Sequence, residues 1–123
     1  MKYLVLIHSN PASRAAWERM TDEQRANFGR AHLELDEQLA LEGVLASSEG
    51  LQPADTAKRV SVRDGKTITS DGPFAEVKEH LAGYYLVDVD TVDDAVAIAA
   101  RVPDAQFGEV EVRPVYDLSQ WEP

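Results

Sequence analysis

The chain has 123 residues, 44% of them hydrophobic, which is the common size and composition of one globular domain with its own core. Its formal net charge of −10, with Lys and Arg scattered rather than gathered in a run, repels nucleic acid phosphates and anionic membranes. The absence of cysteine excludes disulfides, thiolate metal ligands and cysteine nucleophiles, and it fits a reducing, cytoplasmic compartment. We therefore expect a single domain over residues 1–123 that binds neither nucleic acid nor membrane.

The N-terminal segment predicts a strand followed by a short helix. Residues 3–8 form a compact apolar run with β-branched Val5 and Ile7, and the run is closed by Asn10-Pro11. It is too short for the core of a secretory signal, and no small-residue cleavage site follows it. We therefore expect a buried strand here and a short helix over residues 12–20.

A long amphipathic helix is predicted to start at Thr21 and to stop at Gly43. Thr21 and Gln24 have the spacing of a capping box, in which each side chain binds the other residue's backbone N–H. One face of the helix is apolar at helical spacing, at Phe28, His32, Leu35 and Leu39. Residues 44–51 then predict a second strand.

The middle of the chain predicts a β-hairpin. Asp64-Gly65 lies between two runs of alternating strand formers, residues 59–63 and 66–69. Both central residues of a type I′ turn need positive φ, and Asp-Gly is a pair that accepts it. A turn at residues 71–73 comes next, and one helical turn is expected over residues 74–78.

The last part of the chain predicts a strand, a helix and a strand. Residues 81–89 are rich in aromatic and aliphatic side chains and predict a central strand. Thr91 caps a helix that Pro103 stops. Residues 109–116 alternate valines with charged residues and predict the final strand.

This order of elements predicts a ferredoxin-like βαββαβ fold of the α+β class with an inserted hairpin, in which two helices cover one face of an antiparallel sheet. The other face is left uncovered, and a large exposed apolar face is unfavourable in a monomer. A second copy of the chain can cover it, so we expect a homodimer. The tail, residues 117–123, is polar apart from Leu118 and Trp121 and could pack on a neighbour.

His32 is the first candidate for acid-base chemistry. It lies on the apolar face of the long helix, and Asp36 follows four residues later on the same side. A carboxylate partner holds one imidazole tautomer and raises its basicity, as a general base requires. The alternative is a histidine that is hydrogen-bonded at a helix–sheet interface, which the pattern favours at least as much.

Residues on three strands are candidates for ligand binding. Glu111 and Arg113 project from one face of the final strand, where Arg113 could hold an anionic group or simply pair with Glu111. His8 ends the first strand, either at the edge of the core or in a cleft. Tyr84 and Tyr85 point to opposite faces, one towards the core and the other towards the cavity of the dimer. The histidines have no metal-ligand spacing and no nucleotide-binding motif is present, so neither a metal nor a cofactor is expected.

Residues 70–79, Ser-Asp-Gly-Pro-Phe-Ala-Glu-Val-Lys-Glu, are the most distinctive segment of the chain. Asp71-Gly72-Pro73-Phe74 is first of all a well-formed turn, and turn chemistry alone favours a structural role. The functional alternative adds Glu76, Lys78 and Glu79, which crowd charges of both signs beside the turn, where they can shift pKa values at the rim of a cleft. Asp71 would then be an acid-base partner, with Phe74 and Lys78 as ligand contacts.

That segment, together with Leu-Ala-Gly-Tyr-Tyr-Leu-Val-Asp at residues 81–88, resembles the DGPF-type branch of the YCII-related family. The resemblance extends over nearly the whole chain and departs from the family's pattern at Val77, usually Thr, and at Ala82, usually Gly. Arg-Ala-His-Leu at residues 30–33 resembles the broader family's segment in which an Arg shortly precedes His-Leu, which implies that His32 is the family's candidate catalytic histidine. In the DGPF-type branch the position of His8 is commonly Tyr.

The resemblance implies a dimeric ferredoxin-like α+β barrel in a bacterial, intracellular protein, with no settled reaction. Distant relatives include a dehydrochlorinating enzyme with a His-Asp pair, and some members occur beside extracytoplasmic-function sigma factors. One hypothesis is therefore a small homodimeric enzyme that uses His32 with Asp36 or Asp71 for elimination, lyase or isomerase chemistry on a small organic molecule. The alternative is a non-catalytic module that binds a ligand or a protein, linked to sigma-factor regulation, whose acidic surface suits a basic protein face.

Overall fold

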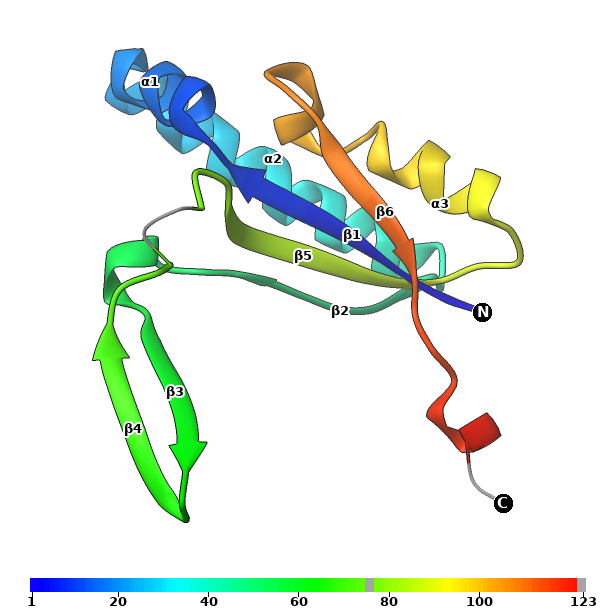
Figure 1. Cartoon of the computed structure of the whole chain (residues 1–123). Helices are drawn as coiled ribbons and strands as arrows, with labels where there is room; N and C mark the ends of the chain where they lie inside the picture. Colours follow the sequence, from blue (N-terminus) through cyan, green and yellow to red (C-terminus); the bar gives the residue numbers. More distant parts are fainter. Residues whose placement is uncertain (75–76, 122–123) are drawn as a thin grey trace.

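A four-stranded antiparallel sheet with helices on one face organises the chain (Figure 1). The computed structural model describes residues 1–74 and 77–121. The strands are β1 (Lys2–Ser9), β2 (Leu45–Gly50), β5 (His80–Asp88) and β6 (Val110–Pro114), in the order β2-β5-β1-β6. The helices are α1 (Pro11–Arg19), α2 (Asp22–Leu41) and α3 (Val92–Ala99). This is the predicted ferredoxin-like α+β fold, and none of the described helices has the length and apolarity to cross a membrane.

Each of these helices begins at a reciprocal capping box. The side chains of Asn10, Thr21 and Thr91 accept a hydrogen bond from the backbone N–H three residues further on. The side chains at those third positions, Ser13, Gln24 and Asp94, in turn accept from the N–H of the cap residue. These bonds satisfy N–H groups that the first turn of a helix leaves without partners, so the chain fixes where its helices begin.

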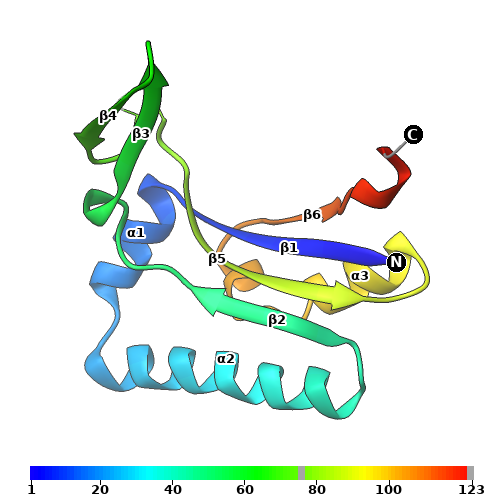
Figure 2. The same cartoon turned by 90° about the horizontal axis from the view of Figure 1, so that it is seen from below.

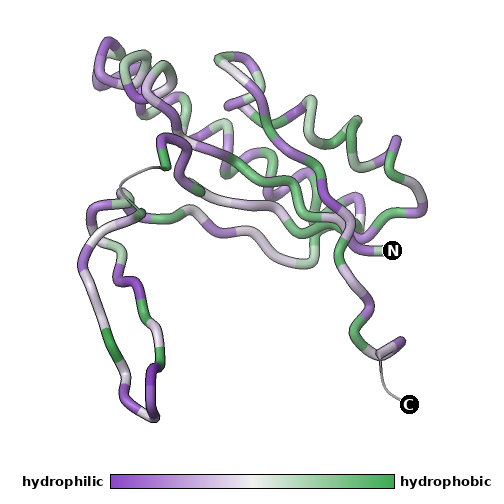
Figure 3. The backbone as a smooth tube through the Cα atoms, viewed as in Figure 1, coloured by the Kyte–Doolittle hydropathy of each residue, from purple (hydrophilic) through white to green (hydrophobic). Residues whose placement is uncertain are grey.

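The core lies between the sheet and the helices α2 and α3. Alternate residues of β1 and β5 point into it and are buried, namely Tyr3, Val5, Ile7, Tyr85 and Val87. They pack against buried residues of the helices and of the turn that follows α3, namely Leu35, Leu39, Ala95, Ile98, Ala99 and Val102. The hydropathy colouring in Figure 3 shows apolar stretches along β1 and α3.

The other face of the sheet carries the intervening residues of the strands. Leu4 and Leu6 of β1 lie opposite Leu86 and Tyr84 of β5, and all four side chains are partly exposed. Helices α2 and α3 lie on the far side of the sheet from them (Figure 1). We call this surface the open face, because none of the described helices covers it.

The predicted hairpin is confirmed, and it forms a second sheet of two strands. β3 (Lys58–Arg63) and β4 (Lys66–Asp71) project from one end of the main sheet (Figures 1 and 2). Asp64 and Gly65 have φ of 51° and 75°, the positive angles that a type I′ turn needs. The helical turn expected over residues 74–78 falls partly on residues 75–76, which lie outside the described part of the chain.

Candidate functional site

His32 lies at the interface between α2 and the sheet, and both of its ring nitrogens are hydrogen-bonded. Nε2 lies 2.7 Å from a carboxylate oxygen of Asp104, and Nδ1 lies 2.6 Å from the hydroxyl of Tyr85. Asp104 belongs to a short 3₁₀ turn, η2 (Pro103–Gln106), that follows α3. The ring of His32 also stacks on Tyr85 and meets Phe28 edge to face. These contacts join α2, β5 and η2.

The partners of His32 fix one tautomer. Burial, and then the charges of Asp36 and Asp104, raise the pKa of Tyr85, so its hydroxyl stays protonated. A carboxylate only accepts hydrogen bonds, so Nε2 of His32 carries the proton and Nδ1 accepts from Tyr85. Both nitrogens of the neutral ring are then used inside the fold, and neither is left for a ligand.

His32 does not pair with either of the carboxylates expected beside it. Asp36 instead accepts a hydrogen bond of 2.7 Å from the hydroxyl of Ser48 on β2. Asp71 ends β4 on the projecting hairpin, where its side chain is 81% exposed and pairs with Lys58. The i, i+4 spacing correctly places Asp36 on the side of the helix that faces the sheet, but its carboxylate binds Ser48. The imidazole of His32 binds Asp104 instead, which lies 72 positions away in the chain.

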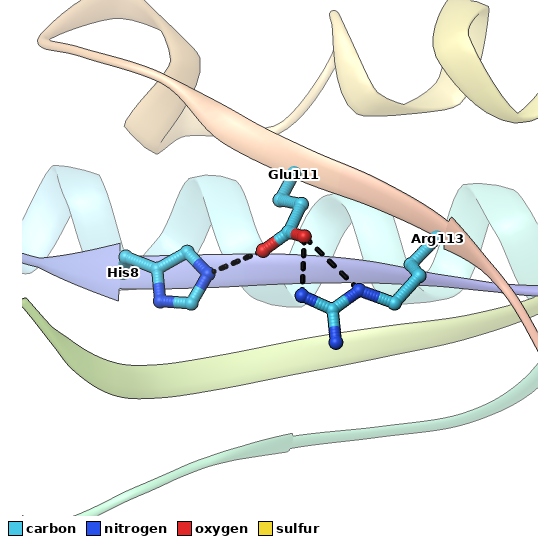
Figure 4. A network of polar contacts seen from close by, with 3 residues as sticks. All are labelled: His8, Glu111 and Arg113. Atoms are coloured by element: carbon cyan, nitrogen blue, oxygen red, sulfur yellow. Dashed lines mark hydrogen bonds and ion pairs between the residues drawn. The ribbon is translucent and has the colours of Figure 1, made fainter.

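A second polar network lies on the open face of the sheet (Figure 4). One carboxylate oxygen of Glu111 lies 2.9 Å from Nε2 of His8, and the other accepts from Nε and Nη2 of Arg113. Strand register explains this meeting, because in the β1–β6 pair Leu6 lies opposite Glu111 and Leu4 opposite Arg113. Side chains two residues apart on a strand share a face, so His8 joins them. The structure therefore brings together three of the residues expected to bind a ligand.

His8 differs from His32 in having one ring nitrogen open. Hydrogen bonds from Arg113 and then from His8 lower the pKa of Glu111, which is therefore ionised at neutral pH. Because the carboxylate only accepts, Nε2 of His8 carries the proton, and in the neutral ring Nδ1 holds the lone pair. Within residues 1–74 and 77–121 this Nδ1 has no hydrogen-bond partner, and the side chain is 27% exposed. One ring nitrogen of His8 is thus left without a partner in the described fold, beside an anchored carboxylate.

Tyr84 belongs to the same surface as this network. Its backbone lies opposite Leu6 in the β1–β5 pair and opposite Glu49 in the β2–β5 pair. Tyr84 and Tyr85 thus point to opposite faces of the sheet, as predicted, with Tyr85 buried and Tyr84 partly exposed. The open face consequently has an apolar floor, with the His8, Glu111 and Arg113 network towards its β6 edge.

Neither Phe74 nor Lys78 is hydrogen-bonded to His8 or His32 in the part of the chain that the structure describes. Phe74 is exposed after the Asp71-Gly72-Pro73 turn, and the guanidinium of Arg59 lies 4.8 Å from the centre of its ring. Lys78 is exposed, and its backbone carbonyl accepts a hydrogen bond from Arg14. Phe74 is one wall of a groove of about 430 Å³ at the foot of the hairpin, whose lining includes neither His8 nor His32. Glu76 lies outside the described residues.

The structure offers no cluster for a metal ion in the part of the chain that it describes, because no three His, Asp or Glu side chains are grouped there as ligands. Sequence reasoning found every member of the His8 network, but it missed Asp104 and the role of Tyr85 beside His32. Asp104 carries no periodic signal that would connect it to α2, and only the preceding Pro103 marks the turn on which it lies.

Comparison with known proteins adds to this geometry. Residues 1–119 match the YCII-related domain family. Over 117 residues the chain is 33% identical to Uncharacterized protein R00369 of Rhizobium meliloti (strain 1021), an alignment that covers 94% of this chain and 92% of the relative. Both matches span nearly the whole fold, including the open face and the His32 interface. The chain therefore belongs to the YCII-related domain family.

Proposed function

We propose that the protein is a homodimeric acid-base enzyme that acts on a small organic anion at the open face of its sheet, with His8 as the base. The observation that carries this proposal is the contrast between the two histidine rings. His32 uses both nitrogens within the fold, whereas His8 has Nε2 held by Glu111 and Nδ1 open. A general base needs such an oriented ring with one free nitrogen.

Arg113 supports the choice of an anionic substrate. Its Nε and Nη2 bind Glu111, and Figure 4 shows the third guanidinium nitrogen, Nη1, pointing away from that carboxylate. The Arg113 side chain is largely exposed. Guanidinium N–H groups bind carboxylates and other oxyanions strongly, so Arg113 can hold the anionic end of a substrate near His8.

The chemistry that suits this arrangement is proton abstraction next to an electron-withdrawing group. The C–H bond of the substrate breaks, the proton moves to Nδ1 of His8, and the electron pair stays on the substrate as an enolate-like anion that Arg113 stabilises. Glu111 stabilises the imidazolium that forms. If the neighbouring carbon bears a leaving group, the electron pair expels it in an elimination; otherwise the proton returns, at the same or another carbon.

A second copy of the chain completes the site in this proposal. The network lies on a sheet face whose apolar residues Leu4, Leu6 and Leu86 are partly exposed, and such a face is unfavourable in water. A facing sheet, packed about 10 Å away, would cover these residues and shield the network from bulk water. Excluding water strengthens the electrostatic interactions on which proton abstraction depends.

A thermal-shift screen with small carboxylates and phenolates tests the proposal. We expect at least one ligand to raise the unfolding temperature of the wild type, because binding to the native state stabilises it by mass action. The shift should disappear in His8→Ala and Arg113→Gln. Arg30→Gln is the matched control, since Arg30 is exposed on α2 and bonds only its neighbour Asn27 among the described residues. A ligand whose shift survives both site variants would contradict the site.

Turnover is tested separately by deuterium exchange. The ligand found in the screen is incubated in D₂O, and its NMR spectrum is followed with wild type, His8→Ala and Arg30→Gln. We expect the acidic C–H signal to be lost with wild type and with Arg30→Gln, and to persist with His8→Ala. Binding without exchange or elimination in the wild type would refute the catalytic part of the proposal.

A further inference from the structure

We propose that in the homodimer the C-terminal segment of each copy, residues 115–121, docks in the groove at the foot of the other copy's hairpin. This inference rests on the homodimer of the proposed function and goes beyond it, because it states how the two copies are oriented. Two surfaces that the acid-base site does not use carry it, and they lie at opposite ends of the main sheet.

The groove is the first of these surfaces. Its volume is about 430 Å³, and its lining is mostly apolar, including Leu51, Pro53, Pro73, Phe74, Val77 and Leu81. Four of these side chains, those of Leu51, Phe74, Val77 and Leu81, are exposed. Pro73 and Phe74 therefore build one wall of an apolar hollow, whereas Asp71 of the same turn pairs with Lys58.

The C-terminal segment is the second surface. Tyr116, Leu118 and Trp121 are 75%, 64% and 69% exposed. The rings of Tyr116 and Trp121 lie 5.4 Å apart, edge to face, so the segment gathers its aromatic groups on itself outside the core. Such an exposed cluster adds little to the stability of a monomer. Its apolar side chains match the apolar lining of the groove.

The placement of the two surfaces limits how a second copy can bring them together. Figures 1 and 2 show the hairpin and the C-terminal segment at opposite ends of the main sheet, and in Figure 1 both extend to the side away from the helices. A second sheet that faces the open face is related by a two-fold axis parallel to both sheets. If the two-fold axis runs along the strands, the hairpin of one copy lies opposite the hairpin of the other. If the axis runs across the strands, each hairpin lies opposite the C-terminal segment of the other copy.

The distribution of charge favours the orientation in which the two-fold axis runs across the strands. Residues 58–71 carry four basic side chains, Lys58, Arg59, Arg63 and Lys66, against two acidic ones, Asp64 and Asp71, in a chain whose net charge is −10. At the other end, residues 88–94 and 115–121 carry five acidic side chains and no basic one, namely Asp88, Asp90, Asp93, Asp94 and Asp117. The N-terminal ammonium, which binds Asp88, and Lys2 only partly offset them.

Like-to-like contact would therefore oppose a basic end to a basic end and an acidic end to an acidic end, and both contacts repel. Contact between opposite ends is attractive twice over in a symmetric dimer. The same rotation carries the apolar C-terminal segment to the apolar groove, so the charge pattern and the apolar pattern favour one arrangement.

Cross-linking tests the orientation, and the chain suits it because it contains no cysteine. Ser61→Cys places a thiol on the exposed side of β3, and Gln120→Cys places one on the exposed C-terminal segment. The two variants are mixed in equal amounts, left to exchange subunits and treated with a short bis-maleimide. We expect cross-links between Ser61→Cys and Gln120→Cys chains, and far fewer between two Ser61→Cys chains.

Light scattering on the same samples separates the possible failures. A monomeric mass at micromolar concentration would contradict both this inference and the proposed function. A dimeric mass with cross-links mainly between two Ser61→Cys chains would overturn the orientation alone and leave the acid-base site standing. A dimeric mass with mixed cross-links supports both.

A variant of the C-terminal segment tests the docking itself. Leu118→Ser with Trp121→Ser removes the apolar contacts, and we expect the dimer dissociation constant to rise roughly tenfold or more, since aromatic anchors dominate interface energetics. Leu33→Ser is the matched control, because Leu33 is exposed on α2 away from the open face. An unchanged dissociation constant in the double variant would overturn the docking.

Discussion

His8 and His32 present the clearest contrast between residues in this protein, and it can be measured as stability. Replacing His32 with Ala leaves Asp104 and the hydroxyl of buried Tyr85 without partners, so we expect the free energy of unfolding to fall by about 1–3 kcal/mol. Replacing His8 with Ala should cost less than about 1 kcal/mol, because Glu111 is 39% exposed and keeps Arg113. Urea unfolding measures both values, and the opposite order would contradict the roles assigned to the two rings.

The same contrast shows what a sequence reveals about single residues. The alternation of the final strand places Glu111 and Arg113 on one face, and the first strand leaves His8 at its end, so each was a candidate by itself. Their meeting depends on the register between β1 and β6, which joins residues about a hundred positions apart in the chain. The partners of His32 likewise come from β5 and η2, and no spacing within α2 predicts them.

Among the elements, β5 is held closely against β2 at Gly83. A Cβ atom added there would lie 2.8 Å from the backbone oxygen of Glu49, and a backbone atom cannot swing aside as a side chain can. Gly83→Ala should therefore lower the free energy of unfolding by roughly 1–3 kcal/mol. Gly29→Ala on α2 is the control: no atom lies within 4 Å of its added Cβ, and helix propensity predicts a gain of about 0.5–1 kcal/mol. Urea unfolding should give the two variants opposite signs; a shared sign would show that the close approach is absent.

The end of α2 is joined to the residues after α3 by an ion pair that makes stability depend on pH. Both guanidinium Nη atoms of Arg101 bind the carboxylate of Glu42, at 2.9 Å and 2.6 Å. The hydrogen bond from Arg101 lowers the pKa of Glu42 below its ordinary value of 4.5. A carboxyl group whose pKa is lower in the folded state stabilises the fold above its unfolded pKa, and that contribution is lost as pH falls through the folded value.

Glu42→Gln tests this link between elements. The variant should be less stable than wild type at neutral pH, and the difference should shrink as the pH falls below 4.5 and Glu42 becomes protonated in the wild type. Urea unfolding at a series of pH values measures the difference. Because the pair is exposed, we expect the effect to be small and sensitive to salt. A difference that does not change with pH would mean that the Glu42 charge is not responsible.

The elements themselves were predictable where their signals are local. Thr21 with Gln24 marks the start of α2, and Asp64-Gly65 marks the hairpin turn, because a few neighbouring residues decide each conformation. The ends of strands differ from the prediction by one or two residues, as at β6, which ends at Pro114 although Val115 still donates to Lys2. A strand ends where its partner ends, and that depends on pairing with a distant part of the chain.

At the scale of the whole molecule, folding places a locally basic segment and a locally acidic segment of the sequence at opposite ends of the sheet. A third of the twelve basic residues gather on the hairpin, while acidic residues concentrate where β5 meets α3. The net charge of −10 argues against nucleic acid, but it does not show this polarity from end to end. The polarity arises because the hairpin projects from one end of the sheet. The turn sequence predicts that a hairpin forms, but it does not predict the direction in which the hairpin projects.

The open face provides the last prediction, because it links the fold to the proposed function. Leu6 lies in the middle of that face, on β1 between Tyr84 of β5 and Glu111 of β6. Leu6→Glu puts a charge where a second sheet would pack, so we expect a monomeric mass by light scattering and a native circular dichroism spectrum, since the face is accessible in the monomer. Leu33→Glu, on the exposed side of α2, should stay dimeric. The monomeric variant should also lose the thermal shift with the ligand of the wild type, because its network is no longer shielded from water. If the Leu6→Glu protein remains a dimer, the dimer interface lies on another surface. The open face would then bind its ligand without a second copy of the chain to cover it.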